Sequence, residues 1–263
     1  MMPLHVAESG PASAPSIVFL HGGGVGGWSW RPQVRAFEGD YHCLAPDLPG
    51  HGQSDEPELF SIPGAARQVA ELIHKRAHDG KAHLVGLSLG AQVGVGVMAV
   101  AARLVERAVF SGASVRPVPF AADLIGPAIR LYAPFKNLGG LIRANQRSLG
   151  VPAEYSAEFA ADTRRATTAG LAQIIKASLT FQAPPGLTRL KNPTLVLVGE
   201  KEPSGQRRSA RMLAASMTGG SAYMVSGMIH NWPLAAPDLF NRTLRAWLED
   251  KPLPPELGPV PRR

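Results

Sequence analysis

Apolar runs recur along the chain at wide intervals. They are Ser16–Leu20 (SIVFL), His42–Pro46 (HCLAP), His83–Leu87 (HLVGL), Arg107–Ser111 (RAVFS), Thr194–Gly199 (TLVLVG) and Ala222–Val225 (AYMV). Their residues are apolar with little alternation, which indicates strands that are buried on both faces. Because sheets of this kind are covered by helices on both sides, the runs predict a mostly parallel sheet at the centre of the molecule.

Helical patterns lie between these runs. Residues 62–81 carry apolar side chains at helical spacing and end near Gly80. Residues 91–104 are apolar nearly all round, which suits a helix packed centrally, and residues 238–250 carry an apolar stripe. The alternation of strand and helix predicts an α/β fold with a doubly wound, mostly parallel sheet.

One long interval, between the fourth and fifth runs, breaks this alternation. It contains short helical patterns interrupted by proline and glycine. Since it follows a strand at the end where ligands collect in open α/β sheets, we expect an inserted helical cap over a site. The predicted domains are a core of residues 1–112 and 186–250 and a cap of residues 113–185. The Pro-rich residues 251–263 are expected to form a flexible tail.

The composition is that of an ordinary globular protein, and the distribution of charge bears on which classes of partner it can bind. Lysine and arginine exceed aspartate and glutamate by 27 to 20, a formal net charge of +7. The basic residues are scattered, which argues against nucleic-acid binding. The single cysteine, Cys43, forms no internal disulfide, and the first residues do not resemble a signal peptide, so we expect a cytoplasmic protein. We expect no membrane span, and the sequence leaves the oligomeric state open.

The chemistry begins with the stretch Gly86-Leu87-Ser88-Leu89-Gly90. It matches G-x-S-x-G, in which a serine stands on a strained turn between a strand and a helix. The glycines allow neighbouring backbone to come close to the turn. An apolar run precedes the motif and a helical pattern follows it, which is the context the motif requires. Ser88 is therefore the predicted nucleophile.

A glycine-rich loop follows the first apolar run, in the stretch FLHGGGVGGWSW. A backbone N–H in this loop and the N–H of Leu89 are positioned to bind one oxyanion together. Gly23 is the expected loop donor and Gly24 the alternative. A phosphate-binding loop is disfavoured, because no Lys-Ser/Thr follows the glycines.

A reactive serine requires a base, and the base requires an acid that orients it. His230 lies after the last apolar run and before the last helical pattern, at the predicted ligand end of the sheet. The acid is expected after Thr194–Gly199, where Glu200 and Glu202 compete. The order serine, acid, histidine matches that of α/β-hydrolases.

Together these stretches resemble the α/β-hydrolase-fold serine hydrolases, esterase-like and with a helical cap. The resemblance covers roughly residues 4–250 and rests on HGGG, DLPGHGQSD, GLSLG, PTLVLVGEKEP and HNWPLAAPDLFNRTLRAWL. It implies a catalytic triad of Ser88, Glu202 and His230, with Glu202 at a position where these proteins usually carry aspartate. A serine nucleophile also argues against haloalkane dehalogenases and epoxide hydrolases, which carry aspartate there.

The implied reaction is hydrolysis of a small-to-medium, largely apolar carboxylic ester through an acyl-enzyme on Ser88. Trp28 and Trp232 are expected to bind the small-molecule substrate, helped by apolar residues of the cap. No metal or cofactor is expected. The alternatives are hydrolysis of a carbon–carbon bond or cofactor-free peracid formation on the same triad. A ligand-binding receptor with little turnover is the third reading.

Overall fold

The computed structural model describes residues 3–261, which contain a single eight-stranded sheet. The strands are β1 (Val6–Ser9), β2 (Ser16–Leu20), β3 (His42–Pro46), β4 (Ala82–Leu87), β5 (Val105–Ser111), β6 (Thr194–Gly199), β7 (Gly220–Val225) and β8 (Leu257–Pro259). Their order in the sheet is β1-β3-β2-β4-β5-β6-β7-β8. The inner strands β3 to β7 pair in parallel, while β1 and β8 pair antiparallel at the two edges. The α/β-hydrolase fold predicted from the sequence is confirmed.

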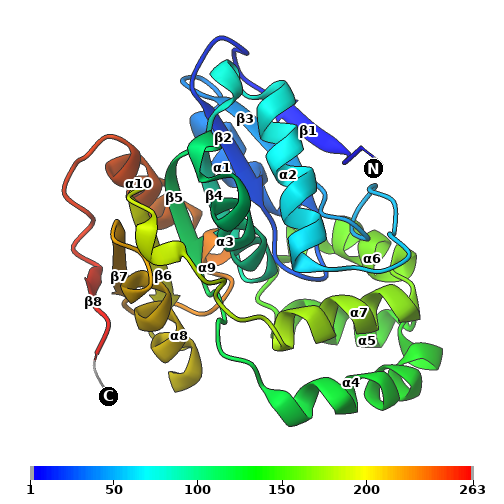
Figure 1. Cartoon of the computed structure of the whole chain (residues 1–263). Coiled ribbons are helices and arrows are strands. Elements are labelled where there is room, and N and C mark those ends of the chain that lie inside the picture. Colours follow the sequence, from blue (N-terminus) through cyan, green and yellow to red (C-terminus); the bar gives the residue numbers. More distant parts are fainter. Residues whose placement is uncertain (1–2, 262–263) are drawn as a thin grey trace.

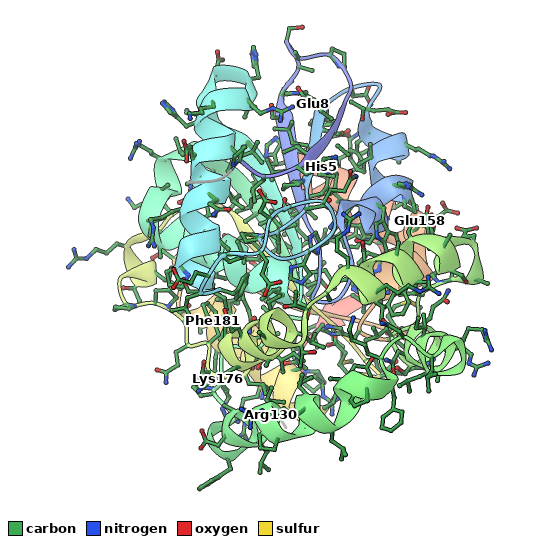
Figure 2. All side chains as sticks on the ribbon, turned by 90° about the vertical axis from the view of Figure 1, so that its right-hand side faces the viewer. His5, Glu8, Arg130, Glu158, Lys176 and Phe181 are labelled. Carbon is green, nitrogen blue, oxygen red and sulfur yellow. The ribbon has the colours of Figure 1, made fainter. Side chains whose placement is uncertain are left out.

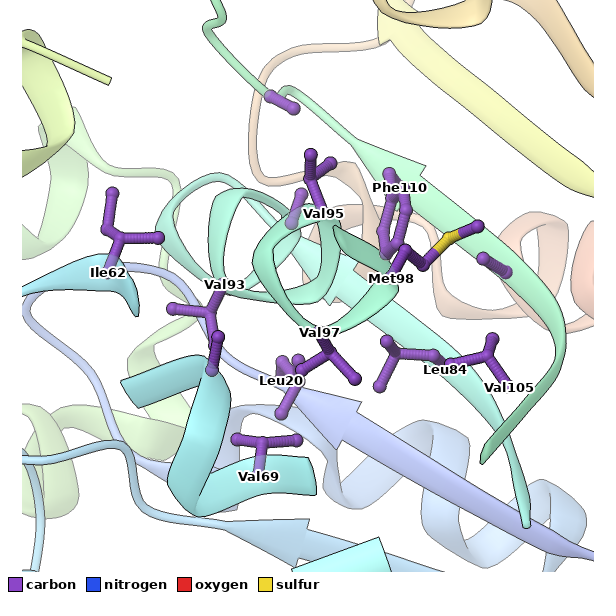
Figure 3. Packing of buried hydrophobic residues seen from close by; sticks show 14 of the residues in the cluster. Leu20, Ile62, Val69, Leu84, Val93, Val95, Val97, Met98, Val105 and Phe110 are labelled. Atoms are coloured by element: carbon purple, nitrogen blue, oxygen red, sulfur yellow. The ribbon is translucent and has the colours of Figure 1, made fainter. Parts of the chain in front are cut away.

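Helices cover both faces of the sheet. Those of the core are α1 (Arg31–Phe37), α2 (Ile62–Arg76), α3 (Leu89–Ala101), α8 (Ser204–Ala215), α9 (Trp232–Ala235) and α10 (Pro237–Leu248). Successive side chains of a strand point to opposite faces. In β2, for example, Val18 and Leu20 join the cluster packed under α2, α3 and α8, whereas Ile17 and Phe19 join the cluster under α1, α9 and α10. The central strands are therefore buried on both sides, and Figure 3 shows the first of these clusters around α3.

Four helices lie between β5 and β6 in the chain, in the segment expected to form a cap, and we call them the cap helices or the cap. They are α4 (Pro119–Tyr132), α5 (Gly139–Ser148), α6 (Ser156–Arg165) and α7 (Thr168–Leu179). Figure 1 shows them grouped at one end of the sheet, between β5 and β6 in chain order. In Figure 2 the labelled side chains of Arg130, Glu158 and Lys176 mark α4, α6 and α7. Within the cap, α4 packs against α7 and α5 packs against α6.

A third apolar cluster joins the cap to the core. It contains Val25 of the glycine-rich loop, Tyr155 and Phe159 from the cap, and Leu234 of α9, with Trp28 packed against it. The Trp28 ring stacks on the Tyr155 ring at a centroid distance of 5.4 Å. This packing fixes α5 and α6 above the carboxyl ends of the parallel strands.

The C-terminal segment differs from the expectation of a flexible tail. Residues Leu257–Pro259 form β8 and pair with β7, with Val225 opposite Leu257. Leu257 and Val260 are buried, and the Ser226 N–H donates to the Glu256 carbonyl at 3.0 Å. The prolines do not prevent this strand from forming, because proline is tolerated in an edge strand whose outer N–H groups face solvent. Within residues 3–261, no helix combines the length and the apolar character that crossing a bilayer requires.

Candidate active site

Ser88 occupies the sharp turn between β4 and α3. Its backbone has φ 55° and ψ −113°, a conformation that L side chains rarely adopt. Holding a residue in such a conformation costs about 1–3 kcal/mol, which the surrounding structure must offset. The Ser88 N–H donates to the Ser111 carbonyl at 2.8 Å, which ties the turn to β5. The half-buried Ser88 side chain therefore stands at the carboxyl end of the central strand β4.

The glycines of the motif are required by close packing around this turn. A Cβ atom on Gly90 would lie 2.1 Å from the Leu20 carbonyl oxygen, and one on Gly86 would lie 2.7 Å from the backbone of Gly90. One helical turn further, a Cβ on Gly94 would lie 2.4 Å from the Phe110 ring. Contacts this short cannot form, so only glycine lets α3 approach β2 and β5 this closely.

A buried histidine fixes the glycine-rich loop. His21 is fully buried, its Nδ1–H donates to the Gly22 carbonyl at 2.7 Å, and its Nε2 accepts from the Leu48 N–H at 2.8 Å. Burial lowers the pKa of His21, which keeps the ring neutral, as this pair of hydrogen bonds requires. The His51 ring packs against it at a centroid distance of 5.0 Å, and burial lowers the pKa of His51 to about 3.

The expected oxyanion donors lie together. Gly23, Gly24, Ser88 and Leu89 line one cavity, and a Cβ on Gly23 would lie 3.9 Å from the Leu89 side chain. Within residues 3–261, the Gly23 N–H has no protein acceptor. Leu89 is the first residue of α3, where N–H groups have no partner within the helix. Both N–H groups are therefore available to an oxygen bound beside Ser88.

The predicted base and acid are in contact. His230, in the loop after β7, places Nδ1 2.5 Å from Oε2 of Glu202. The other oxygen of Glu202, Oε1, accepts from the Gly199 N–H at 2.8 Å, so the buried carboxylate is held at both ends. With Nδ1–H directed at a carboxylate, the neutral imidazole has its free lone pair on Nε2. Glu200 is exposed and instead accepts from the Gly227 N–H at 2.7 Å.

Ser88 and His230 line one cavity of about 590 Å³, together with Glu202 and residues of α8; we call it the His230 cavity. Its wall includes Gly112, whose φ is +64° and whose Cβ would lie 2.5 Å from Cε1 of His230. A side chain at position 112 would displace the imidazole. Within the described residues, no hydrogen bond joins Ser88 Oγ to His230. Such contacts are often long without a bound substrate.

A second cavity, of about 510 Å³, extends from Ser88 under the cap; we call it the cap cavity. Most of its wall is apolar and comes from Leu89, Ile129, Leu149, Phe159, Leu171, Ile174, Ile175 and Leu179. Its polar wall residues beyond the core loops include Tyr132, Lys136, Asn145 and Asp162. Ser88 borders both cavities, whereas His230 borders the His230 cavity alone.

Three expectations about substrate-binding residues are wrong. Trp232 is fully buried and its Nε1–H donates to Ser111 Oγ at 2.9 Å, so it belongs to the core. Trp28 does not line either cavity at Ser88, because its ring packs on Tyr155 and its Nε1–H donates to Asp162. The cap was also expected to contribute apolar side chains to substrate binding, but several of its large apolar residues are exposed: Leu124, Leu131, Phe135 and Leu138.

Two site residues were not singled out from the sequence. Gly112 directly follows β5, as Ser88 follows β4, and that parallel was the available signal. Asp162 was only one of several acidic cap residues. Its place in the cavity depends on how α6 docks on the core, which no local pattern encodes.

Comparisons with known proteins place this geometry in context. A model described as the alpha/beta hydrolase family matches residues 17–243. The (E)-2-((N-methylformamido)methylene)succinate hydrolase of Acinetobacter baylyi is 25% identical over 254 residues, which cover 94% of this chain and 95% of the relative. An AB hydrolase superfamily protein of Gibberella zeae is 26% identical over 254 residues, covering 94% and 84%.

The fold is also shared with solved structures. The crystal structure of the enol-lactonase from Burkholderia xenovorans has a TM-score of 0.78 at 23% identity, covering 94% of this chain and 96% of that one. A thermophilic esterase from Thermogutta terrifontis has a TM-score of 0.75 at 19% identity, covering 94% and 93%. At these identities, the likeness shows the architecture alone.

Proposed function

Because the chain belongs to the alpha/beta hydrolase family, we propose that it is a serine hydrolase that cleaves small-to-medium, largely apolar carboxylic esters through an acyl-enzyme on Ser88. One observation carries the proposal. His230, bound to the buried Glu202, lines the same cavity as a serine held in a strained turn. This is the arrangement that a nucleophile, its base and the orienting acid require.

In the proposed reaction, Ser88 Oγ attacks the ester carbonyl carbon while His230 Nε2 takes the hydroxyl proton. The N–H groups of Leu89 and of Gly23 or Gly24 bind the oxyanion. His230 then gives its proton to the alcohol oxygen as the carbon–oxygen bond breaks. A water molecule then attacks the acyl-enzyme carbonyl carbon while His230 takes its proton. The bond to Ser88 Oγ breaks, the acid is released and Ser88 regains its proton from His230. Glu202 stays ionised and stabilises the imidazolium.

The two cavities suggest where each half of the ester lies. The leaving alcohol must receive its proton from His230, so it must occupy the His230 cavity. The acyl group then extends into the cap cavity, whose wall is mainly apolar and whose volume is about 510 Å³. A cavity of this size and polarity suits a short-to-medium acyl chain.

The first test replaces Ser88 by alanine. The variant should keep the fold and lose roughly 10⁴–10⁶ in kcat on p-nitrophenyl butanoate, because the nucleophile acts together with the rest of the triad. A fluorophosphonate probe should label the unsubstituted chain and not the variant. Retention of most of the activity would remove Ser88 from the mechanism. Failure of the folded, unsubstituted chain to react with the probe would favour a ligand-binding protein.

The second test addresses the bond that is cleaved. Initial rates are compared for p-nitrophenyl esters of graded acyl length, a lactone and a β-diketone. We expect the short-to-medium esters to have the highest kcat/KM. A β-diketone turned over faster than any ester would instead assign carbon–carbon bond hydrolysis to the same triad.

A further inference from the structure

One carboxylate interrupts the apolar wall of the cap cavity. Asp162, on α6, lies between the cavity that extends from Ser88 and a separate cavity beside Trp28, and it lines both. It shares this wall with apolar side chains, among them Phe159 one helical turn before it and Ile174 of α7. A carboxylate placed among apolar side chains is costly unless it is paired or hydrogen-bonded. Its surroundings therefore decide what it accepts from a ligand.

Asp162 is only partly satisfied by the protein. Its Oδ2 accepts from the Trp28 Nε1–H at 2.6 Å. Among residues 3–261, it forms no ion pair with a lysine, arginine or histidine. The guanidinium of Arg165, on the same helix, donates instead to the Gly52 carbonyl. A carboxylate has about four acceptor positions on its two oxygens, so most of those on Asp162 have no donor within the described part of the chain.

Burial also affects the charge of this group. Burial raises the pKa of Asp162 above its ordinary value, and the nearby carboxylates of Asp47 and Glu158 act in the same direction. The Trp28 hydrogen bond and Arg165 oppose them. The carboxylate therefore gains from any further donor that reaches it, and a second carboxylate beside it is unfavourable.

We propose that Asp162 is a specificity residue of the acyl site, which favours acyl groups that carry a hydrogen-bond donor and disfavours acyl groups that end in a carboxylate. The preferred donors are hydroxyl, amide N–H and, most strongly, ammonium groups, because hydrogen bonds between charged partners are about twice as strong as neutral ones. This inference rests on the proposed function, since it takes the cap cavity to be the acyl site.

The other charged residue of the cap cavity has a different role. Lys136 donates through Nζ to the carbonyls of Thr163 and Arg164, at 3.0 Å each. These carbonyls belong to the last turn of α6, where a cation is favoured by the helix dipole. Two of the three donors of Lys136 are thus engaged within the cap, whereas the Asp162 carboxylate has one hydrogen-bond partner among residues 3–261.

The test uses Asp162→Asn, in which the amide oxygen still accepts from Trp28 while the charge is lost. Asp123→Asn serves as the matched control, because Asp123 is an exposed carboxylate on α4 of the same cap, away from both cavities at Ser88. The substrates are p-nitrophenyl esters of hexanoic acid, 6-aminohexanoic acid and adipic acid. They share one chain length and differ in the terminal group.

The measured quantity is kcat/KM for the amino ester divided by kcat/KM for the adipic monoester. In Asp162→Asn this ratio should fall about tenfold or more, since the substitution removes one favourable and one unfavourable charge pair. The Asp123→Asn ratio should stay at the level of the unsubstituted chain. An unchanged ratio in an active Asp162→Asn variant would overturn the inference and leave the proposed function standing.

Failure of the proposed function is recognised separately. If the unsubstituted chain neither hydrolyses the esters nor reacts with a fluorophosphonate, the inference is judged by calorimetric binding of 6-aminohexanamide. Affinity about tenfold higher for the unsubstituted chain than for Asp162→Asn would support it, by the same charge-assisted hydrogen bond. Equal affinities would overturn it.

Discussion

Glu202 and Glu200 differ in burial and in partners, although only one residue separates them. The Glu202 carboxylate is buried, and its two oxygens bind different partners, His230 and the Gly199 N–H. Glu200 is exposed and holds the Gly227 N–H. The longer side chain of glutamate reaches His230 here because its second oxygen is anchored by backbone at the end of β6.

Substituting each glutamate by glutamine should separate their contributions. Glu202→Gln should lower kcat roughly 10³–10⁴-fold, because the amide no longer stabilises the imidazolium or selects the required tautomer. Glu200→Gln should change kcat by no more than about twofold, as for a surface substitution. Steady-state rates on p-nitrophenyl butanoate give the comparison. The opposite ranking would transfer the role of the acid to Glu200.

Site residues could be predicted from the sequence where a short local motif determines their position. Ser88 could be placed on a strained turn because G-x-S-x-G encodes that turn in five consecutive residues. The contact of His230 with Glu202 could be expected from chain order, and the catalytic roles of both stay predictions. The placement of Trp232 was wrong because a large aromatic residue near a site can serve the core equally well. Asp162 was missed because its position depends on docking of the cap.

At the scale of elements, α3 stands out for how closely it approaches the sheet. Glycines spaced four residues apart, at positions 86, 90 and 94, allow this approach. Gly90 has the shortest contact, because a Cβ there would collide with the Leu20 carbonyl oxygen. The N-terminus of α3 is thereby brought to the turn that holds Ser88, where its unpaired N–H groups favour a developing negative charge.

Gly90→Ala should therefore destabilise the fold by about 1–3 kcal/mol or more, as overpacking does. The matched control is Gly140→Ala in α5, where an added Cβ meets nothing within 4 Å and no proline follows. That substitution should stabilise the protein by about 0.5–1 kcal/mol, through the lower conformational entropy of the unfolded chain. Urea unfolding of both variants provides the measurement. A neutral Gly90→Ala would mean that α3 can move away from β2.

How deeply an element is buried explains whether it could be predicted from the sequence. The inner strands were recognised because burial on both faces leaves a continuous apolar run, as in Thr194–Gly199. The edge strands β1 and β8 were missed because their residues are partly exposed and carry polar side chains or proline. The cap helices were expected as a group. Their apolar positions did not show which of them would face the cavity.

At the scale of the whole molecule, buried neutral histidines make stability depend on pH. His21 and His51 lie against each other, and burial lowers the pKa of both, that of His51 to about 3. In the unfolded chain, both return to the ordinary histidine value of about 6.5. The unfolded state therefore binds more protons below that pH, and the free energy of unfolding decreases as pH falls from about 6.5 toward 3.

The slope of this decrease can be measured by urea unfolding between pH 7 and pH 4. Each such histidine contributes about 1.4 kcal/mol per pH unit once the pH is well below 6.5. His51→Gln, which keeps a donor near the Pro49 carbonyl, should reduce the slope by about one proton. A slope that is identical in the variant would show that His51 is protonated in the folded state.

The C-terminal strand β8 is expected to contribute to the stability of the whole fold. Removing residues 252–263 deletes β8 together with the buried side chains of Leu257 and Val260. The loss of two buried aliphatic side chains should cost about 3–6 kcal/mol. A marked fall in the thermal midpoint is expected. An unchanged midpoint would show that β8 adds nothing to the stability of the sheet.

The positive φ of Ser88 favours the proposed catalytic activity but lowers the stability of the fold. A glycine would relieve strain of about 1–3 kcal/mol, which outweighs its own entropic cost of about 0.5–1 kcal/mol, and would remove the proposed nucleophile. Directed evolution that rewards thermal tolerance alone would thus favour an inert enzyme. A serine in this turn therefore serves the proposed turnover at the expense of stability.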